Sequence, residues 1–374
     1  MKVVYVFRSL AIWGGIERII VDKANYLSGL ADYDVAIFTA DQGDHPVPYE
    51  LRDGVRLEDL KIRMHTQYRF RGLWRLWKGW QLERRFVRLL RQRLDDVRPD
   101  VVVCVASDYP HLVVEAVGGR GPVVIESHSI YQRTFTQLRL LNRLRNWRLD
   151  KALKAAQTIV TLTPDDAAEW RKHYKNVVNI PNMVSQNPTG RRGDADLRRV
   201  ILVARMDDQK RVDLALKIWK SITAEQPDWQ LHIYGEGDRQ KRIESMAASI
   251  SGVVLHKPTD HIFDAYCDSS FLILTSLYEP FGLVMPEAMS CGLPVVAFDC
   301  PYGPRSIITD GVDGFLVAEG DERAFADRMR LLMTQPERCR AMGDAAIGKA
   351  HSFAAPAIMP RWTELFKDVT GRYL

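Results

Sequence analysis

The sequence predicts an α/β protein built from two doubly wound, Rossmann-like domains that face a central cleft. Short apolar runs alternate with longer segments of helical spacing along nearly all of the 374 residues. The runs lack a regular polar–apolar alternation, which is typical of parallel sheets covered by helices on both faces. A chain of this length suits two hydrophobic cores better than one.

The expected elements alternate between strand and helix. In the first half we expect strands at Val3–Phe7, Val35–Thr39, Val101–Ala106, Val123–Glu126 and Thr158–Leu162. In the second half we expect them at Val200–Ala204, Gln230–Tyr234, Val253–His256, Phe271–Leu274, Pro294–Phe298 and Gly314–Val317. Helical spacing is clearest at Glu17–Leu30, Val212–Thr223 and Glu322–Met333.

The alternation is interrupted between residues 186 and 194, where Pro188, Gly190 and Gly193 lie among polar residues. This stretch falls at the midpoint, where a linker between two domains belongs. We therefore expect an N-terminal domain at residues 1–185 and a C-terminal domain at 186–355. Residues 356–374 carry Trp362 and Phe366 at helical spacing and are predicted to form a helix that packs back on the N-terminal domain.

The composition is that of a soluble globular protein, with 46% hydrophobic and 26% charged residues. No segment approaches the ~20 apolar residues of a membrane-spanning helix, and the apolar run at the N-terminus is too short for a signal peptide. We therefore expect a cytoplasmic protein. The five cysteines are scattered without a Cys-x-x-Cys pair, which predicts reduced, buried thiols instead of disulfides or a zinc site.

Several loops that follow predicted strands carry residues suited to an anionic ligand. Gly14-Gly15 lies between the first strand and a helix start, where free amides favour a phosphate, although such a pair also suits a plain turn. Arg205 and Lys210 follow another strand and could clamp a diphosphate, or could be ordinary solvated charges. Gly235 follows the next strand and allows either a close ligand contact or a turn.

The segment from Glu279 to Glu287 is the strongest local signal. Glu279 is predicted in a loop after a buried strand, and Glu287 about one turn into a helix that begins near Val284. Amides at that helix start suit a phosphate. Carboxylates accept hydrogen bonds from sugar hydroxyls, so we expect two acids that flank an anion site to hold a sugar and a ribose.

In this order the motifs resemble glycosyltransferase family 4, whose members are retaining enzymes with the two-domain GT-B fold. The resemblance runs from the Gly14-Gly15 loop through Arg-x4-Lys, Gly-Glu-Gly and Glu-x7-Glu to the segment Gly311–Val317. It implies that residues 1–185 bind the acceptor and that residues 186–355 bind the nucleotide-sugar donor.

The resemblance also implies individual roles. Arg205 and Lys210 would bind the donor pyrophosphate, Glu287 the ribose, and Glu279 a hydroxyl of the transferred sugar. The whole implied donor-binding set is Gly14, Gly15, Arg205, Lys210, Gly235, His256, Lys257, Glu279, Phe281, Gly282, Leu283, Val284 and Glu287. The implied catalytic set is His128, Glu279, Arg205 and Lys210. A lone histidine is more often structural, but His128 follows a strand at the edge where α/β sheets bind ligands.

In the resembling family the acceptor attacks the same face that the diphosphate leaves. The charge on the leaving group would be met by Arg205, Lys210 and the helix start after Gly282. We therefore expect no metal and no other cofactor beside the nucleotide sugar. UDP is the expected carrier on family frequency, and the donor sugar is left open.

A basic, tryptophan-rich segment lies within the expected N-terminal domain. Residues 61–98 hold twelve Lys and Arg against three acids. Trp74 and Trp77 lie there among Arg71, Arg75 and Lys78, which suits peripheral contact with an anionic membrane. The alternative is that the tryptophans pack into the domain. A second basic stretch, from Arg139 to Arg148, repeats the pattern.

The sequence thus predicts a retaining hexosyltransferase at the inner face of the cytoplasmic membrane. Its acceptor would be a glycan or lipid-linked glycan in cell-envelope polysaccharide or lipopolysaccharide synthesis, and no nucleic-acid partner is expected. Two alternatives stay open. One is a polyanion- or membrane-binding Rossmann-like protein without transferase activity, and the other is a GT-B sugar-nucleotide epimerase. The oligomeric state is also left open.

Overall fold

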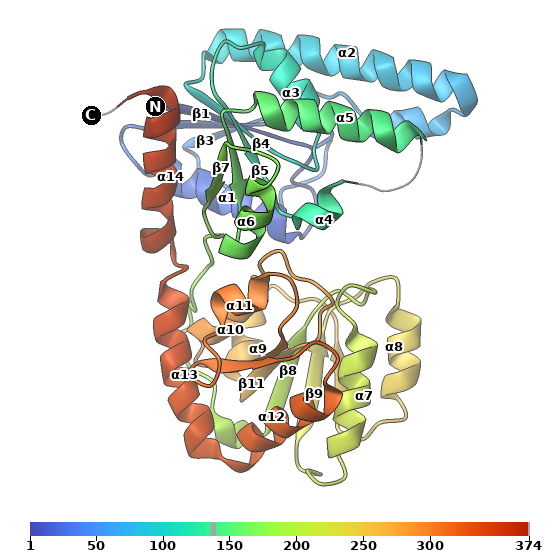
Figure 1. The fold of residues 1–374 in the computed structure, drawn as a ribbon, viewed down its shortest axis with the longest axis vertical. Coiled ribbons are helices and arrows are strands. Elements are labelled where there is room, and N and C mark those ends of the chain that lie inside the picture. Colours follow the sequence, from blue (N-terminus) through green and yellow to red (C-terminus); the bar gives the residue numbers. More distant parts are fainter. Residues whose placement is uncertain (136–139, 373–374) are drawn as a thin grey trace. The chain divides into compact units, whose positions relative to one another are not determined.

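The structure, a computed structural model, describes the backbone of residues 1–135 and 140–372 and the side chains of these residues except 140–142. The chain forms two compact units (Figure 1). Unit 1 comprises Met1–Met183 together with the C-terminal segment from Ile358, and unit 2 comprises Val184–Ala357. Each unit has its own parallel sheet and its own hydrophobic core.

Unit 1 contains a seven-stranded sheet in the order β3-β2-β1-β4-β5-β6-β7, and every pair is parallel. Its strands are β1 (Lys2–Phe7), β2 (Asp34–Thr39), β3 (Val55–Asp59), β4 (Val101–Val105), β5 (Val123–Glu126), β6 (Thr158–Thr161) and β7 (Val177–Asn179). Its helices are α1 (Gly15–Ser28), α2 (Gly72–Val97), α3 (Pro110–Val117), α4 (Tyr131–Thr134), α5 (Leu140–Ala155), α6 (Pro164–Arg171) and α14 (Ala355–Thr370), with a 3₁₀ turn at Met64–Arg69.

Alternate residues of these strands point to opposite faces of the sheet, which helices cover on both sides. Val4, Val6 and Ile125 face a core to which α2, α3, α5 and α6 contribute. Tyr5 points to the other face, where Lys23 of α1 lies against the rings of Tyr5 and of Trp362 in α14. This second face carries the buried polar residues Lys23 and Glu126.

Unit 2 contains a six-stranded parallel sheet in the order β10-β9-β8-β11-β12-β13. Its strands are β8 (Arg199–Val203), β9 (Gln230–Tyr234), β10 (Val253–His256), β11 (Phe271–Leu274), β12 (Val295–Phe298) and β13 (Gly314–Val317). Its helices are α7 (Val212–Ile222), α8 (Gln240–Ala247), α9 (Ile262–Cys267), α10 (Val284–Ser290), α11 (Gly303–Ile307), α12 (Glu322–Thr334) and α13 (Pro336–His351), with a 3₁₀ turn at Ala195–Leu197.

The predicted fold class, two doubly wound parallel α/β units, is confirmed. The eleven expected strands are present, each within one residue of its expected ends. β3 and β7 were not expected. They are edge strands, and β3 exposes polar residues while β7 has three residues, so neither leaves the apolar run that marks a buried strand.

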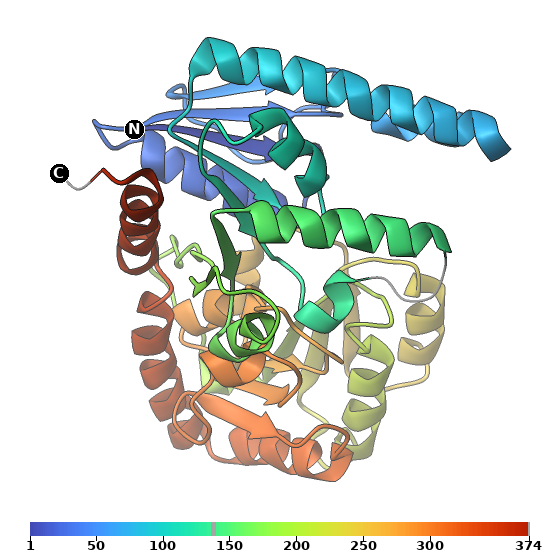
Figure 2. The same cartoon turned by 45° about the horizontal axis from the view of Figure 1, so that its top comes forward.

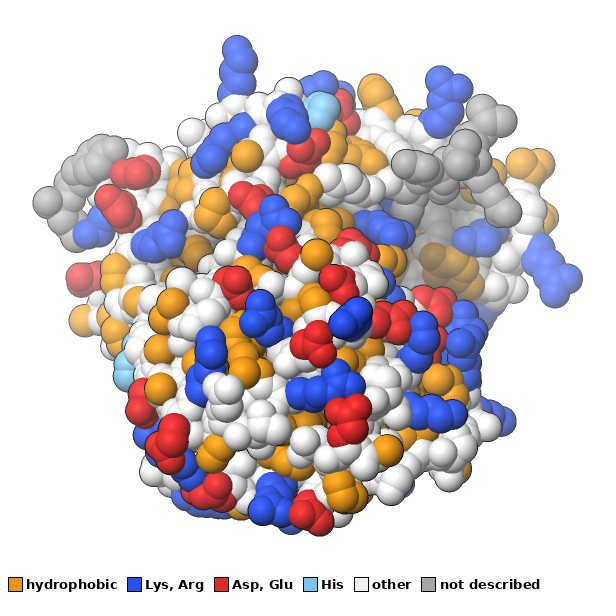
Figure 3. Space-filling model, turned by 60° about the horizontal axis from the view of Figure 1, so that its bottom comes forward, with side chains coloured by type: hydrophobic (Ala, Val, Ile, Leu, Met, Phe, Trp, Pro, Cys, Tyr) orange, Lys and Arg blue, Asp and Glu red, His pale blue; other side chains and the backbone are white. Residues whose placement is uncertain are grey.

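The surface and the cysteines agree with the composition. Lys and Arg lie interspersed with Asp and Glu on the face shown in Figure 3. All five cysteines are buried and free, as predicted. No helix in the described part of the chain is both long and apolar enough to cross a membrane.

Gly235 shows why a strand end in unit 2 requires glycine. It has φ +147°, and a Cβ built on it would lie 1.9 Å from the carbonyl oxygen of Ala204. The loops after β8 and β9 approach so closely there because the amide of Met206 donates to the carbonyl of Glu236 at 2.9 Å. In the structure, the close contact at Gly235 is therefore one of backbone against backbone.

We expect Gly235→Ala to lower the free energy of unfolding by about 2 kcal/mol or more, because the new methyl group must displace the Ala204 carbonyl. The matched control is Gly348→Ala in α13, where a Cβ meets nothing within 4 Å. This variant should stabilise the helix by up to about 1 kcal/mol. Urea unfolding measures both variants. Equal stability of Gly235→Ala and the wild type would contradict the close approach.

Candidate functional site

Lys210 and Glu279, 69 residues apart, form an ion pair beside the sheet of unit 2. β8 and β11 are neighbours in the sheet, so the loops that follow them start at the same edge. Lys210 Nζ lies 2.5 Å from Glu279 Oε1, and Ser276 Oγ donates to the same oxygen at 2.6 Å. Both side chains of the ion pair are largely buried. The carboxylate is therefore held from two sides.

The two loops are joined by further hydrogen bonds. The hydroxyl of Thr275 donates to the carbonyl of Lys210 at 3.1 Å, and Arg211 Nε donates to the carbonyl of Thr275 at 2.9 Å. The amide of Leu277 donates to the carbonyl of Gln209 at 2.7 Å. These bonds fix the backbone on both sides of the Lys210–Glu279 pair, so the pair is preorganised.

Arg205 lies at the start of the same loop as Lys210 but is not part of this pair. Its side chain is 70% exposed and pairs with Asp207 at 3.0 Å. The other carboxylate oxygen of Asp207 accepts the amide of Lys210 at 3.0 Å. Asp207 thus links the two predicted cations through their loop and leaves the guanidinium of Arg205 accessible to an anion.

Glu287 lies one turn into α10, as predicted, and is buried. The hydroxyl of Tyr266 donates to Glu287 Oε2 at 3.4 Å. Within the described residues the backbone amides of Gly282, Leu283 and Val284 donate no hydrogen bond, as is usual at a helix start. Phe281 is buried and fixes the loop between the two glutamates to the core. The same loop therefore combines a fixed backbone with amides that are available to a ligand.

His256 and Lys257 lie where β10 ends, at the edge of the same sheet. The His256 ring stacks on Tyr234 with ring centroids 4.2 Å apart, and its Nε2 lies 3.1 Å from Nδ1 of His232. Burial and the neighbouring His256 lower the pKa of His232 to about 4, which keeps that ring uncharged at neutral pH. Lys257 is exposed.

In unit 1, His128 belongs to a buried cluster that was not predicted from the sequence. His128 Nε2 lies 3.1 Å from Glu126 Oε2, and the Lys23 ammonium is bonded to the same oxygen. Burial opposes ionisation of Glu126, but Lys23 and His128 outweigh it and lower the pKa of Glu126 to about 2. The Lys23 ammonium lies 4.1 Å from the centre of the Trp362 ring.

Two sequence signals could have revealed this cluster. Lys23 falls on the apolar stripe of α1, which includes Ile19, Ala24 and Leu27. Glu126 directly follows three apolar residues in a strand that is buried throughout. A charge at such a position needs a partner of opposite sign.

The Gly14-Gly15 pair starts α1, as predicted, but an acid lies beside it. The Glu17 carboxylate is within 2.0 Å of the place where a Gly14 Cβ would be, and burial raises the pKa of Glu17. Asp108, which accepts the amide of Arg8 at 3.0 Å, also has a pKa raised by burial. This edge of the unit 1 sheet thus holds two carboxyl groups that are costly to ionise.

The basic, tryptophan-rich segment forms the start of α2, with Arg71 just before the helix. Trp74 and Trp77 are 68% and 50% exposed, so the alternative in which they pack into the domain is wrong. Arg75 is also exposed, and Lys78 is partly exposed. Figure 2 shows this end of α2 projecting beyond the sheet of unit 1.

The second basic stretch lies on α5. Arg139 and the side chains of Leu140 and Leu141 lie outside the described residues. Leu144 and Trp147 are exposed. Arg148 makes two hydrogen bonds to Glu83 of α2, at 3.0 and 2.8 Å, which ties the two basic helices together.

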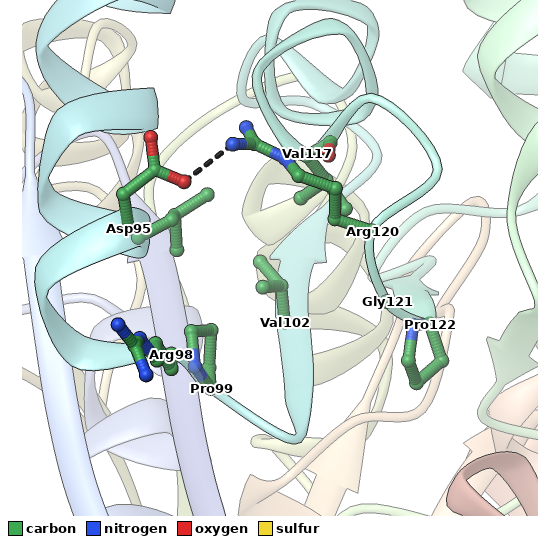
Figure 4. A pocket seen from close by; sticks show the side chains of 9 residues that line it. Asp95, Arg98, Pro99, Val102, Val117, Arg120, Gly121 and Pro122 are labelled. Carbon is green, nitrogen blue, oxygen red and sulfur yellow. Dashed lines mark hydrogen bonds and ion pairs between the residues drawn. The ribbon is translucent and has the colours of Figure 1, made fainter.

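A separate pocket lies at the opposite edge of the unit 1 sheet, where β4 and β5 begin. Figure 4 shows Asp95 and Arg120 joined by an ion pair, with Arg98 and Pro122 also in the lining. Ligands of open α/β sheets bind at the carboxyl ends of the strands, and this pocket contains none of the predicted site residues. The pocket is therefore separate from the candidate site.

The chain matches two family descriptions in succession. Residues 13–187 match Glycosyltransferase Family 4, and residues 191–349 match Glycosyl transferases group 1. An exopolysaccharide phosphotransferase of Streptomyces coelicolor is 28% identical over 293 residues, which are 76% of this chain and 28% of that protein. The amylovoran biosynthesis glycosyltransferase AmsD of Erwinia amylovora is 23% identical over 368 residues, 94% of this chain and 95% of that protein.

This chain thus spans about a quarter of the first relative and nearly all of the second. Among solved structures, a TarM variant of S. aureus in complex with fondaparinux, alpha-GlcNAc-glycerol and UDP has a TM-score of 0.77 at 15% identity. The match covers 98% of this chain and 99% of that one. At this identity the likeness concerns the fold.

The Glu126 cluster predicts a specific dependence of stability on pH. Unfolded Glu126 takes up a proton near its ordinary pKa of 4.5, whereas folded Glu126 does so only near 2. The unfolded state binds more protons in this window, so this contribution to the free energy of unfolding falls by roughly 2–3 kcal/mol from pH 5 to pH 2. Urea unfolding should show a weaker pH dependence for Glu126→Gln than for the wild type.

The control for this measurement is Glu364→Gln, which removes an exposed carboxylate from α14. It should retain the slope of the wild type. Parallel curves for the wild type and Glu126→Gln would contradict the lowered pKa of Glu126.

Proposed function

Because the chain belongs to the glycosyltransferases of family 4 and group 1, we propose that it moves a sugar from a nucleotide diphosphate sugar to an acceptor. The observation that carries the proposal is the preorganised Lys210–Glu279 pair beside the free amides of residues 282–284. The cation and the amides can bind phosphate, and the carboxylate can accept hydrogen bonds from sugar hydroxyls.

In this proposal the donor binds along the edge of the unit 2 sheet. Both cations would bind the diphosphate. Arg205 is exposed and would contact it from the solvent side, whereas Lys210 is largely buried and would contact it from the protein side. Glu279 would accept from a hydroxyl of the transferred sugar, and Glu287 from the ribose. Charge that develops on the leaving diphosphate would be met by fixed groups that need no rearrangement.

We propose UDP as the carrier, and the base would lie near His256 and Lys257. The similar TarM structure was solved with UDP, which supports this choice. Sequence similarity to an amylovoran biosynthesis glycosyltransferase supports polysaccharide synthesis as the setting. The acceptor would be a glycan or lipid-linked glycan bound on unit 1, where His128 follows β5.

We further propose that the transfer retains the anomeric configuration of the sugar and needs no metal. Two cations and the free amides near Gly282 supply the electrostatic stabilisation that a divalent ion would otherwise provide. Product with an inverted anomeric centre would overturn the stereochemical part.

The proposed location is the inner face of the cytoplasmic membrane. The start of α2 exposes Leu73, Trp74, Trp77 and Trp80 between cationic side chains. Tryptophan favours the interface between lipid and water, and Lys and Arg favour anionic headgroups. A lipid-linked acceptor would be presented at the same surface.

We expect the wild-type protein to release UDP from a UDP-sugar when an acceptor is added, in the presence of EDTA. Glu279→Gln should lower kcat about 100-fold, because it weakens an interaction with the reacting sugar. Glu287→Gln should mainly raise KM for the donor, because the ribose does not react. A panel of nucleotide sugars with and without lipid-linked acceptors measures these effects.

Glu364→Gln, an exposed change on α14, is the control and should retain full activity. Release of no nucleoside diphosphate from any donor would favour the polyanion-binding alternative. Conversion of the donor into another nucleotide sugar without an acceptor would favour the epimerase.

We expect the wild type to bind vesicles that contain anionic phospholipid and to bind neutral vesicles weakly. Trp74→Ala/Trp77→Ala should reduce binding at least tenfold, because two interfacial anchors are lost. The control Val178→Ala/Leu197→Ala shortens two other exposed apolar residues and should bind like the wild type. Vesicle sedimentation measures binding, and undiminished binding of the tryptophan variant would exclude α2 as the contact.

A further inference from the structure

The Lys23–Glu126 ion pair lies on the face of the unit 1 sheet that α1 and α14 cover. The side chains of Lys23 and Glu126 are each 1% exposed. Glu126 ends β5, and its Oε2 accepts both from Lys23 and from the His128 ring nitrogen 3.1 Å away. The other carboxylate oxygen, Oε1, is buried without a hydrogen-bond partner among the described residues.

A third group completes the surroundings of the pair. Trp362 of α14 is buried, and its ring lies 4.1 Å from the Lys23 ammonium, a distance typical of a cation–π contact. The centre of the Tyr5 ring in β1 lies 5.8 Å from the same ammonium. The C-terminal helix therefore closes the cluster around Lys23 and Glu126 against water.

Stability alone is a weak reason for such an arrangement. The desolvation of two buried charges can cost more than their attraction returns, and apolar residues of similar volume often pack as well. One Glu126 oxygen also lacks a partner, which adds to the cost. The position of the pair points to a role other than stability, because Glu126 is hydrogen-bonded to His128.

We propose that Lys23, Glu126 and Trp362 position His128 for the transfer reaction. A carboxylate can only accept hydrogen bonds, so His128 Nε2 carries the proton that points to Glu126. The other ring nitrogen, Nδ1, is then the one offered to the substrate. This inference rests on the proposed function for its catalytic meaning, and on the described contacts for its geometry.

Lys23 has a separate task in this arrangement. A buried carboxylate without a nearby cation would tend to become protonated, because burial disfavours its charged form. With the ammonium bonded to the same oxygen, the carboxylate stays ionised and serves His128 as a fixed hydrogen-bond acceptor. The Trp362 ring adds a cation–π contact to the same ammonium. None of the three residues needs to touch substrate, so they are positioning residues.

The test is the double variant Lys23→Met/Glu126→Leu, which removes both charges and leaves no unpaired ion. Its matched control is Lys217→Met/Glu322→Leu, which removes an exposed Lys–Glu pair in unit 2. Three quantities are measured on each full-length protein: unfolding by urea, kcat and KM for the donor, and the ring N–H proton of His128 by NMR with ¹⁵N-labelled histidine.

We expect the wild type to show a slowly exchanging His128 ring N–H proton, and the double variant to lose it. The double variant should stay folded, with kcat lowered roughly ten- to a hundredfold and donor KM within about twofold, as when groups that orient a functional histidine are removed. The control should resemble the wild type in all three quantities. A folded double variant with wild-type kcat would overturn the proposal.

A second variant keeps the test decisive if the double variant does not fold. Trp362→Leu leaves both charges and removes only the ring beside Lys23, so we expect kcat to fall severalfold at unchanged donor KM. Wild-type kcat in this variant would also overturn the proposal. An inactive wild type that still shows the protected His128 proton would instead refute the proposed function, because the hydrogen bond would exist without the reaction.

Discussion

Parallel pairing of neighbouring strands is the constraint on which the candidate sites depend. When all strands run in one direction, their carboxyl ends lie at one edge of the sheet, and residues distant in sequence meet there. In unit 2 this brings Lys210, after β8, to Glu279, after β11. In unit 1 it brings the residues that follow β1, β4 and β5 to one edge, including Asp108 and His128.

Each sheet carries a buried ion pair near this edge, and the two pairs differ in their surroundings. Lys210–Glu279 lies between loops that are joined by hydrogen bonds, and Lys210 keeps some exposure, so a ligand can reach it. Lys23–Glu126 is enclosed by α1, β5 and Trp362 and contacts His128 instead of solvent. The first pair is suited to direct binding, and the second to holding another side chain.

Much of the fold and part of the candidate site could be predicted from the sequence. Buried parallel strands are continuous apolar runs, so β1 and β11 were expected almost to the residue, whereas the edge strands β3 and β7 left no such signal. The helix start at Val284 was expected because Pro286 suits a first turn. The Lys210–Glu279 contact could not be derived, because strand order decides which loops are neighbours.

By itself the sequence determined the alternation of elements, the residue types after each strand and the amphipathic character of α2, because these depend on local periodicity and composition. Only the tertiary structure decided which charges are paired and which are free. Arg205 is exposed while Lys210 is held by Glu279, and Lys23 is buried against Glu126 while Trp74 stays in solvent. Burial and distance set the strength of a charge interaction, and both arise from contacts between segments far apart in the chain.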